Sequence, residues 1–422
     1  MNRQSLRAFL YLAIGLVLAA ATPQGQLSFT PFQASGIYDL DERAGWTVTL
    51  PPDAAAPTGT YTYVIKKNNA DTIKAGAFDL SQGPATIEIT SSEPAMLYVE
   101  VSPPAAAGAN AIHLGAAIAP TQLKPSVPRP ADFDSFWDAK LKSLDEIPIN
   151  PVLTPGESHK AGVDFYTVQL DSLGSHVQGY LAKPSREGKF PALVIFQYAG
   201  VYALQPNTVT DRAAEGWLAF DVDSHDMPPA QASGVSTSYQ SIGNTGRETS
   251  YFLNMYLRDS RAIDYIATRP DWDGKTIMIM GTSMGGQQSL VTAGLNHKVT
   301  AVIVNEPSGA DTNGNLHSRK AGYPNWPSND AKVMETALYF DPVNFASRIK
   351  APVLAAIGFI DTTSPPAGIW TAMNQIRGPR EVVSMVESDH NNKTPEKQGA
   401  YNSRCKEVLG MILAGGEFKP RD

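Results

Sequence analysis

The sequence is poor in cysteine and in closely spaced histidines, which excludes two common ways of stabilising or equipping a protein. A single cysteine, Cys405, among 422 residues rules out an intrachain disulfide and a Cys-rich metal site. None of the 7 histidines forms an H-x-x-x-H pair, the spacing of many helical zinc sites. The one local cluster of ligand types is His225 with Asp223 and Asp226, which we interpret as a polar loop. We therefore expect no metal and no cofactor.

Basic residues are too few to give the chain a cationic surface. Asp and Glu total 41 against 34 Lys and Arg, so the formal net charge is -7. Nucleic acids and anionic membranes both attract clustered positive charge. We therefore expect neither as a partner.

Only the start of the chain carries a long apolar run. Arg3 and Arg7 precede the stretch from Ala8 to Ala20, and alanines at 19–21 offer small residues for cleavage. The run is short for a membrane span. Residues 1–21 are therefore predicted to be a signal peptide, and the mature chain is expected to be secreted or periplasmic, with no stable membrane span.

Residues 26–120 show the apolar alternation of short strands. Four such runs lie at 46–50, 61–65, 87–89 and 97–101, separated by Pro, Asn and Gly turn signals. The pattern predicts a small all-β, sandwich-like domain. Because the region has no convergent ionisable cluster, we expect a packing module rather than a carbohydrate-binding one.

A proline-rich stretch with Pro120, Pro125 and Pro130 then marks a domain boundary. Beyond it, short apolar runs alternate with longer helical patterns, which is typical of a mostly parallel sheet covered by helices on both faces. Residues 121–422 are thus predicted to form one α/β domain. Its expected elements are a helix at 132–144, a hairpin at 163–170 and 177–181, and strands at 192–196, 217–222, 277–280, 299–304, 353–357 and 382–386.

The segment Gly281–Gly286, Gly-Thr-Ser-Met-Gly-Gly, fits the tight turn that exposes a nucleophilic serine. It follows an apolar run and precedes helix-compatible residues, which is the strand, turn and helix context of a G-x-S-x-G nucleophile elbow. The two flanking glycines leave room for the backbone to pass close to its neighbours. Ser283 is therefore the candidate nucleophile.

A serine hydroxyl needs an imidazole to take its proton and a carboxylate to orient that imidazole. In the α/β-hydrolase arrangement the acid and then the histidine follow the serine along the chain. Asp361 and His390 each come just after a predicted strand, where parallel sheets place their ligands. His297 and His317 fit this order less well. Asp389 is an alternative acid, but it is adjacent to His390 in sequence.

Together these pieces resemble the acetyl xylan esterase and cephalosporin C deacetylase family, the seventh family of carbohydrate esterases. The matching segments span roughly residue 125 to the C-terminus and lie at 129–137, 197–200, 281–286, 339–346, 358–366 and 378–381, followed by His390. The resemblance implies an α/β-hydrolase fold behind the small all-β domain. It also implies a serine esterase that hydrolyses acetyl esters of carbohydrates, such as acetylated xylan or its oligosaccharides, through an acetyl-enzyme.

The resemblance assigns Ser283 as nucleophile, His390 as general base and acid, and Asp361 as its partner. A tetrahedral intermediate also needs two backbone donors for its oxyanion. One is expected to be the N–H of Met284, directly after the nucleophile. The resemblance aligns Val201 with the family's second donor.

One segment departs from the family. Residues 223–226 read Asp-Ser-His-Asp, where the family often has Arg-Gly-Gln-Gly, so pocket selectivity and oligomeric state stay open. Two other functions also stay open: a serine peptidase of the prolyl oligopeptidase kind, and a carbohydrate-binding protein with an inactive hydrolase domain. The N-terminal region lacks the internal repeats of a propeller, which disfavours the peptidase.

Overall fold

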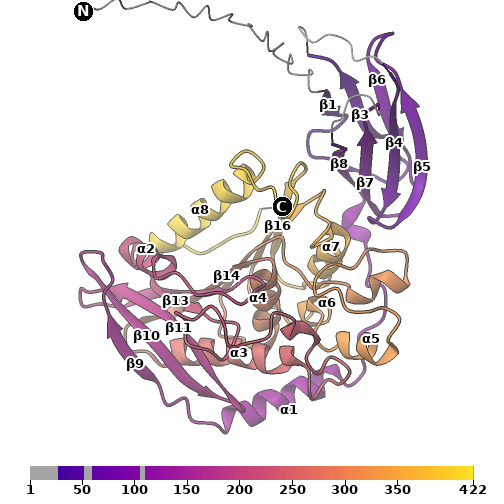
Figure 1. Ribbon diagram of the computed structural model, residues 1–422. Helices are drawn as coiled ribbons and strands as arrows, with labels where there is room; N and C mark the ends of the chain where they lie inside the picture. Colours follow the sequence, from indigo (N-terminus) through magenta and orange to yellow (C-terminus); the bar gives the residue numbers. More distant parts are fainter. Residues whose placement is uncertain (1–26, 52–58, 105–109, 422) are drawn as a thin grey trace, which may run out of the picture.

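The computed structural model describes residues 27–51, 59–104 and 110–421. The predicted signal peptide at 1–21 lies outside these residues. Among the helices of the described ranges, none is both long and apolar enough to cross a membrane. Figure 1 shows a small β region beside a larger α/β body.

The N-terminal β region consists of two sheets that share one core. The three-stranded sheet has the order β1-β3-β6 and the five-stranded sheet the order β2-β8-β7-β4-β5. Trp46, Ile65, Ile87 and Val99 are buried in the common core. The strands are β1 Ser28–Pro31, β2 Ile37–Tyr38, β3 Ala44–Thr49, β4 Tyr61–Lys67, β5 Asp71–Phe78, β6 Ala85–Ile89, β7 Ala95–Ser102 and β8 Ile112–Ile118.

The small β region was expected from sequence and is present, while the boundary at residue 120 stays a prediction. The four predicted runs correspond to β3, β4, β6 and β7. β5 was not predicted because most of its side chains are exposed or half-buried on both faces, which removes the period-2 contrast. β8 was not predicted because the side chains in its second half are mostly small and all of them are buried.

The α/β body is built on a nine-stranded sheet with the order β17-β16-β15-β14-β12-β13-β11-β10-β9. Strands β12 to β17 pair in parallel, and β9, β10 and β11 extend the sheet with antiparallel pairs. This confirms the predicted α/β fold class. The strands are β9 Val152–Gly156, β10 Val163–Ser172, β11 Ser175–Pro184, β12 Phe190–Phe196, β13 Leu218–Val222, β14 Trp272–Thr282, β15 Ala301–Asn305, β16 Val353–Gly358 and β17 Arg380–Met385.

Successive residues of a strand point to opposite faces of the sheet. Because both faces carry apolar side chains, helices cover both of them. Val194 packs in the core under α3, α4 and α7, whereas its neighbour Leu193 packs in the core under α2 and α8. The helices are α1 Phe133–Asp145, α2 Asn207–Glu215, α3 Tyr251–Thr268, α4 Met284–Leu295, α5 Ala331–Ala337, α6 Pro342–Ala346, α7 Pro366–Gln375 and α8 Gly399–Leu413, with 3-10 turns η2 Pro120–Gln122, η3 Tyr239–Ser241 and η4 Thr312–Leu316.

The carboxyl ends of the parallel strands gather the predicted site residues at one edge of the sheet. Ser283 follows β14, Asp361 lies three residues beyond β16, and His390 lies in the loop that connects β17 to α8. Loops at this edge are the usual ligand-binding position of open α/β sheets.

Candidate active site

Ser283 sits at a sharp turn between β14 and α4. Its backbone has φ 57° and ψ -121°, a conformation that side chains rarely adopt and that is typical of a nucleophile elbow. The neighbouring glycines make the turn possible. A Cβ on Gly285 would lie 2.2 Å from the Phe196 carbonyl oxygen, and one on Gly281 would lie 2.2 Å from the carbonyl carbon of Gly285. The sequence pattern around Ser283 therefore reflects a steric need.

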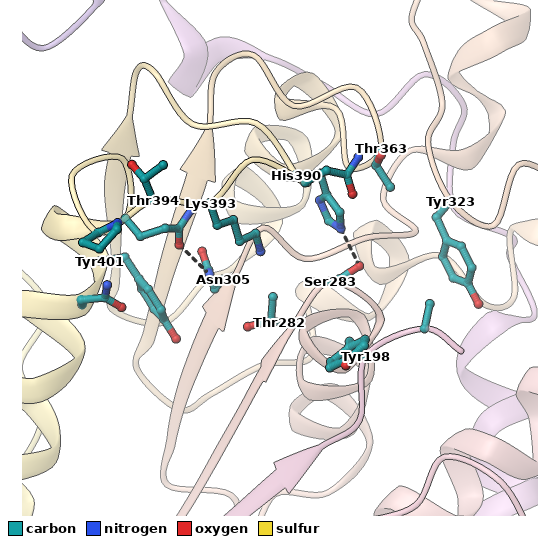
Figure 2. A pocket seen from close by; sticks show the side chains of 15 residues that line it. Tyr198, Thr282, Ser283, Asn305, Tyr323, Thr363, His390, Lys393, Thr394 and Tyr401 are labelled. Atoms are coloured by element: carbon teal, nitrogen blue, oxygen red, sulfur yellow. Dashed lines mark hydrogen bonds between the residues drawn. The ribbon is translucent and has the colours of Figure 1, made fainter. Parts of the chain in front are cut away.

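The structure brings Ser283, His390 and Asp361 into one hydrogen-bonded chain, although they are far apart in sequence. Ser283 Oγ lies 2.9 Å from His390 Nε2 (Figure 2), and His390 Nδ1 lies 2.7 Å from Asp361 Oδ2. The Asp361 carboxylate is 0% exposed. Its other oxygen, Oδ1, accepts the backbone N–H groups of Thr363 at 2.8 Å and Ser364 at 2.7 Å. The geometry is that of a nucleophile, a base and an orienting acid.

The alternative residues lie elsewhere. Asp389 Oδ1 accepts the backbone N–H groups of Asn391 and Asn392, and its Oδ2 faces Lys397, so this carboxylate does not face the imidazole. His297 lines a separate cleft beside Lys350, where burial and then Lys350 lower its pKa. His317 is exposed in the segment after η4.

The predicted oxyanion donors belong to two segments, the start of α4 and the loop after β12. Met284 is the first residue of α4, where backbone N–H groups have no partner within the helix. Val201 lies in the loop after β12, and its half-buried side chain packs against the aromatic core of the α/β body. Tyr198 and Ala199 of the same loop line the cavity around Ser283. The donor role of Val201 stays a prediction.

Ser283 and His390 line a cavity of about 880 Å³. Tyr198 exposes 55% of its surface here. Its ring stacks on Tyr202 with centroids 4.5 Å apart, so it is held in place. Figure 2 shows Lys393, Thr394 and Tyr401 across the cavity from Tyr198. The lining residues are Tyr198, Ala199, Thr282, Ser283, Asn305, Tyr323, Thr363, His390, Asn391, Lys393, Thr394, Pro395, Gln398, Tyr401 and Asn402.

Glu306 is a buried acid beside the site that the sequence analysis missed. It is 0% exposed, and its Oε2 lies 2.8 Å from Lys393 Nζ. Its Oε1 accepts hydrogen bonds from Ser388 Oγ at 2.9 Å and Gln398 Nε2 at 3.3 Å. All three partners belong to the segment that carries His390, so Glu306 anchors that segment. Glu306 directly follows β15, and this position after a strand is the signal that could have found it.

Glu306, Asp361 and His390 offer ligand atoms within 4.8 Å of one another, a spacing that could hold a cation. However, Asp361 and His390 bind each other and Glu306 pairs with Lys393, so each group already has a partner within the protein. The absence of a metal stays an expectation. The other cluster, at residues 223–226, lies in the loop after β13, and its first three residues are 0% exposed, so this polar loop is buried.

The N-terminal β region contacts the loop that carries Asp361. Asn69 Nδ2, in the turn between β4 and β5, donates to the Asp361 carbonyl oxygen at 3.4 Å. Gly115 of β8 packs so closely that an added Cβ would lie 2.6 Å from Phe359 Cβ. The cavity around Ser283 is lined only by residues from 198 onward in the part of the chain that the structure describes. The β region thus packs against the loop that carries Asp361, and its described residues do not line the cavity.

A mostly parallel sheet with helices on both faces and a serine elbow at its strand ends defines the class of α/β hydrolases. The chain belongs to the acetyl xylan esterase (AXE1) family, whose profile matches residues 121–405. This confirms the family resemblance inferred from the sequence motifs, and with it a carboxylic ester hydrolase.

Individual relatives agree with this assignment. The chain is 30% identical over 380 residues to acetyl esterase Axe7A of Xylanibacter ruminicola, covering 85% of each chain. It is similar to the structure of an acetyl xylan esterase from Paenibacillus sp. R4, with a TM-score of 0.60 and 25% identity over 68% of this chain and 98% of that one. Acetyl xylan esterase 1 from Thermoanaerobacterium sp. JW/SL YS485 shares the fold, with a TM-score of 0.60 and 20% identity over 70% of this chain and 97% of that one.

Proposed function

We propose that the protein is a serine esterase that removes acetyl groups from carbohydrates, of the acetylated xylan or xylo-oligosaccharide type, through an acetyl-enzyme. The observation that carries this proposal is the continuous chain from Ser283 Oγ through His390 to the buried Asp361. Family membership and the names of the relatives, acetyl esterase and acetyl xylan esterase, support the substrate class.

In the first half of the reaction, His390 Nε2 takes the hydroxyl proton while Ser283 Oγ attacks the acetyl carbonyl carbon. The carbonyl oxygen becomes an oxyanion, and we assign its stabilisation to the backbone N–H of Met284 and to a backbone donor from the loop after β12. When the intermediate collapses, the bond between carbonyl carbon and sugar oxygen breaks and His390 returns its proton to that oxygen. The products are the free sugar hydroxyl and acetylated Ser283.

In the second half, His390 removes a proton from water, whose oxygen attacks the acetyl carbon of the acetyl-enzyme. Collapse of this second intermediate releases acetate and returns the proton to Ser283 Oγ. Asp361 holds the imidazole through Nδ1 and stabilises the imidazolium that forms in each half. The groups named therefore complete the cycle without a cofactor.

The cavity suits a sugar ester better than a small free ester. Its volume of about 880 Å³ lies in the range of ligand pockets for whole small molecules, which leaves room for sugar rings beyond the acetyl group. The exposed face of Tyr198 offers a fixed aromatic surface for a ring, and Asn391, Asn402 and Thr394 add polar groups to the lining. These features support a carbohydrate as the alcohol part of the substrate.

The test is acetate release from acetylated xylo-oligosaccharides by the wild type, Ser283→Ala and Ser289→Ala. We expect Ser283→Ala to lose activity by about 10⁶-fold, as for other serine hydrolases, with an unchanged melting temperature. Ser289→Ala is the matched control, because this serine lies in α4, the helix that follows Ser283, and within the described residues its hydroxyl bonds only to the Gly285 carbonyl oxygen. Substantial turnover by folded Ser283→Ala would rule out the serine mechanism.

We further propose that the mature protein is exported, as the sequence of residues 1–21 indicates. The N-terminal sequence of the protein recovered from a bacterial periplasm or medium tests this. A mature start near residue 22 is expected, and full-length protein retained in the cytoplasm would contradict export.

A further inference from the structure

The loop that supplies the predicted second oxyanion donor is fixed at Gly200 by two side chains. Gly200 N–H donates to the Tyr239 hydroxyl oxygen at 3.2 Å. The Gly200 carbonyl oxygen lies 3.0 Å from His225 Nε2. Gly200 stands between Ala199, which lines the cavity, and Val201. Both polar groups of this one residue are therefore held by side chains instead of by a sheet or helix.

The side chain of His225 is buried and hydrogen-bonded through both ring nitrogens. It is 0% exposed, and its Nδ1 lies 2.8 Å from the Tyr251 hydroxyl. Burial lowers the pKa of His225, and burial raises the pKa of Tyr251 to about 12. A neutral imidazole and a protonated phenol give one consistent arrangement: Tyr251 donates to Nδ1, and Nε2–H donates to Gly200.

Tyr239 links the same loop to the first oxyanion donor. Its ring meets His225 edge-on, with centroids 4.7 Å apart. Its hydroxyl lies 2.9 Å from that of Tyr323, and these two hydroxyls lie 3.2 Å and 3.1 Å from Met284 Sδ. Tyr323 in turn lines the cavity close to Ser283, as Figure 2 shows. One buried network thus contacts both the loop after β12 and the residue after the nucleophile.

We propose that His225 and Tyr239 are positioning residues that hold Gly200 and thereby aim the backbone N–H of Val201, which shares a peptide unit with the Gly200 carbonyl, at the oxyanion. This inference rests on the proposed esterase mechanism. An oxyanion hole works only when its donors lie about 2.7–3.1 Å from the developing charge, and a misplacement of about 1 Å costs on the order of 100-fold in rate. The proposal also gives a role to His225, which belongs to residues 223–226, the segment that departs from the family pattern.

The experiment compares Tyr239→Phe, His225→Ala and His225→Gln with the wild type. Each variant is assayed for kcat and KM on p-nitrophenyl acetate. Each is also assayed for inhibition by trifluoroacetone, a ketone that forms a tetrahedral adduct with a reactive serine. We expect Tyr239→Phe and His225→Ala to lower kcat by about 10- to 100-fold, to leave KM nearly unchanged, and to weaken the adduct in parallel. His225→Gln keeps an N–H donor and should recover much of the lost rate.

His176→Gln is the matched control, since this half-exposed histidine on β11 faces Asp171 and Asp226 rather than the site. If His225→Ala fails to fold, Tyr239→Phe still decides the question, because it removes a single oxygen atom from a buried ring. Folded Tyr239→Phe with wild-type kcat and adduct affinity, or with a raised KM alone, would overturn the proposal. Loss of activity in Ser283→Ala in that case would leave the esterase mechanism intact, so the two failures are distinguishable.

Discussion

Asp361→Asn is the substitution whose outcome follows most directly from the geometry of the site. Asp361 Oδ1 accepts two backbone N–H groups, from Thr363 and Ser364. In the variant, the amide oxygen must keep that position, because turning the NH2 group there would leave two buried donors unpaired, at about 1–3 kcal/mol each. The NH2 group therefore faces His390 Nδ1. The imidazole must then accept at Nδ1 and carry its proton on Nε2.

An Nε2–H group points at Ser283 Oγ and cannot take the hydroxyl proton. The variant is thus folded but holds the wrong tautomer, and kcat should fall on the order of 10⁴-fold, as for an acid-to-amide change in serine hydrolases generally. At about 1.36 kcal/mol for each tenfold change, this is a barrier increase of about 5.4 kcal/mol. Steady-state kcat on p-nitrophenyl acetate measures the effect, and thermal melting tests whether the variant is folded.

Asp389→Asn is the matched control for this substitution. Its carboxylate accepts local backbone N–H groups and pairs with Lys397, and it lies one residue before His390. We expect kcat to change by less than about threefold, well under 1 kcal/mol of barrier. A folded Asp361→Asn enzyme that keeps a tenth of the wild-type kcat would refute the reasoning. So would an Asp389→Asn enzyme that loses as much as Asp361→Asn.

Two further predictions concern buried carboxylates near the site. Glu306→Gln removes the ion pair with Lys393, whose side chain is 29% exposed and can turn to water, so we expect the free energy of unfolding to fall by only about 2 kcal/mol; urea denaturation measures this, and an unchanged midpoint would contradict the anchoring role of Glu306. Burial raises the pKa of Asp223 to about 7, above the value of about 3.9 in an unfolded chain. Between about pH 4 and pH 7 the folded state therefore keeps a proton on Asp223 that the unfolded state has lost. The free energy of unfolding thus falls as the pH rises through this range. Asp223→Asn should flatten the plot of unfolding free energy against pH in that window, and an unchanged slope would show that Asp223 ionises normally in the folded protein.

The central sheet could be predicted because its strands are buried on both faces. β16 is a buried run without polar side chains, and β15 is apolar up to its last residue, Asn305, and buried throughout, so each run is recognisable without knowing its neighbours. The order of the strands and the extension by β9 at the edge could not be read in this way. β9 reads Val-Leu-Thr-Pro-Gly and is largely exposed, and only its pairing with β10 makes it a strand.

The triad could be predicted for a related reason, since Ser283, Asp361 and His390 each follow a recognisable strand. His225 and Tyr239 could not be predicted, because neither belongs to a motif and both act on Gly200, 25 and 39 residues earlier in the chain. Glu306 stands in the same kind of position as Asp361, but nothing in the sequence distinguishes an acid that orients a histidine from one that anchors its loop. Those roles depend on contacts between distant segments.

The N-terminal β region shows most clearly how such contacts change an interpretation. From sequence it is a separate packing module, yet Met96 and Ala117 are part of the same buried core as the strands of the large sheet. Its β4–β5 turn bends through Asn68 and Asn69, both with positive φ, a conformation that asparagine tolerates better than most residues. This bend lets Asn68 accept Lys320 N–H through its carbonyl oxygen while Asn69 reaches Asp361. Because the region packs against the loop that orients His390, loosening that contact should affect catalysis even though the region stays outside the cavity.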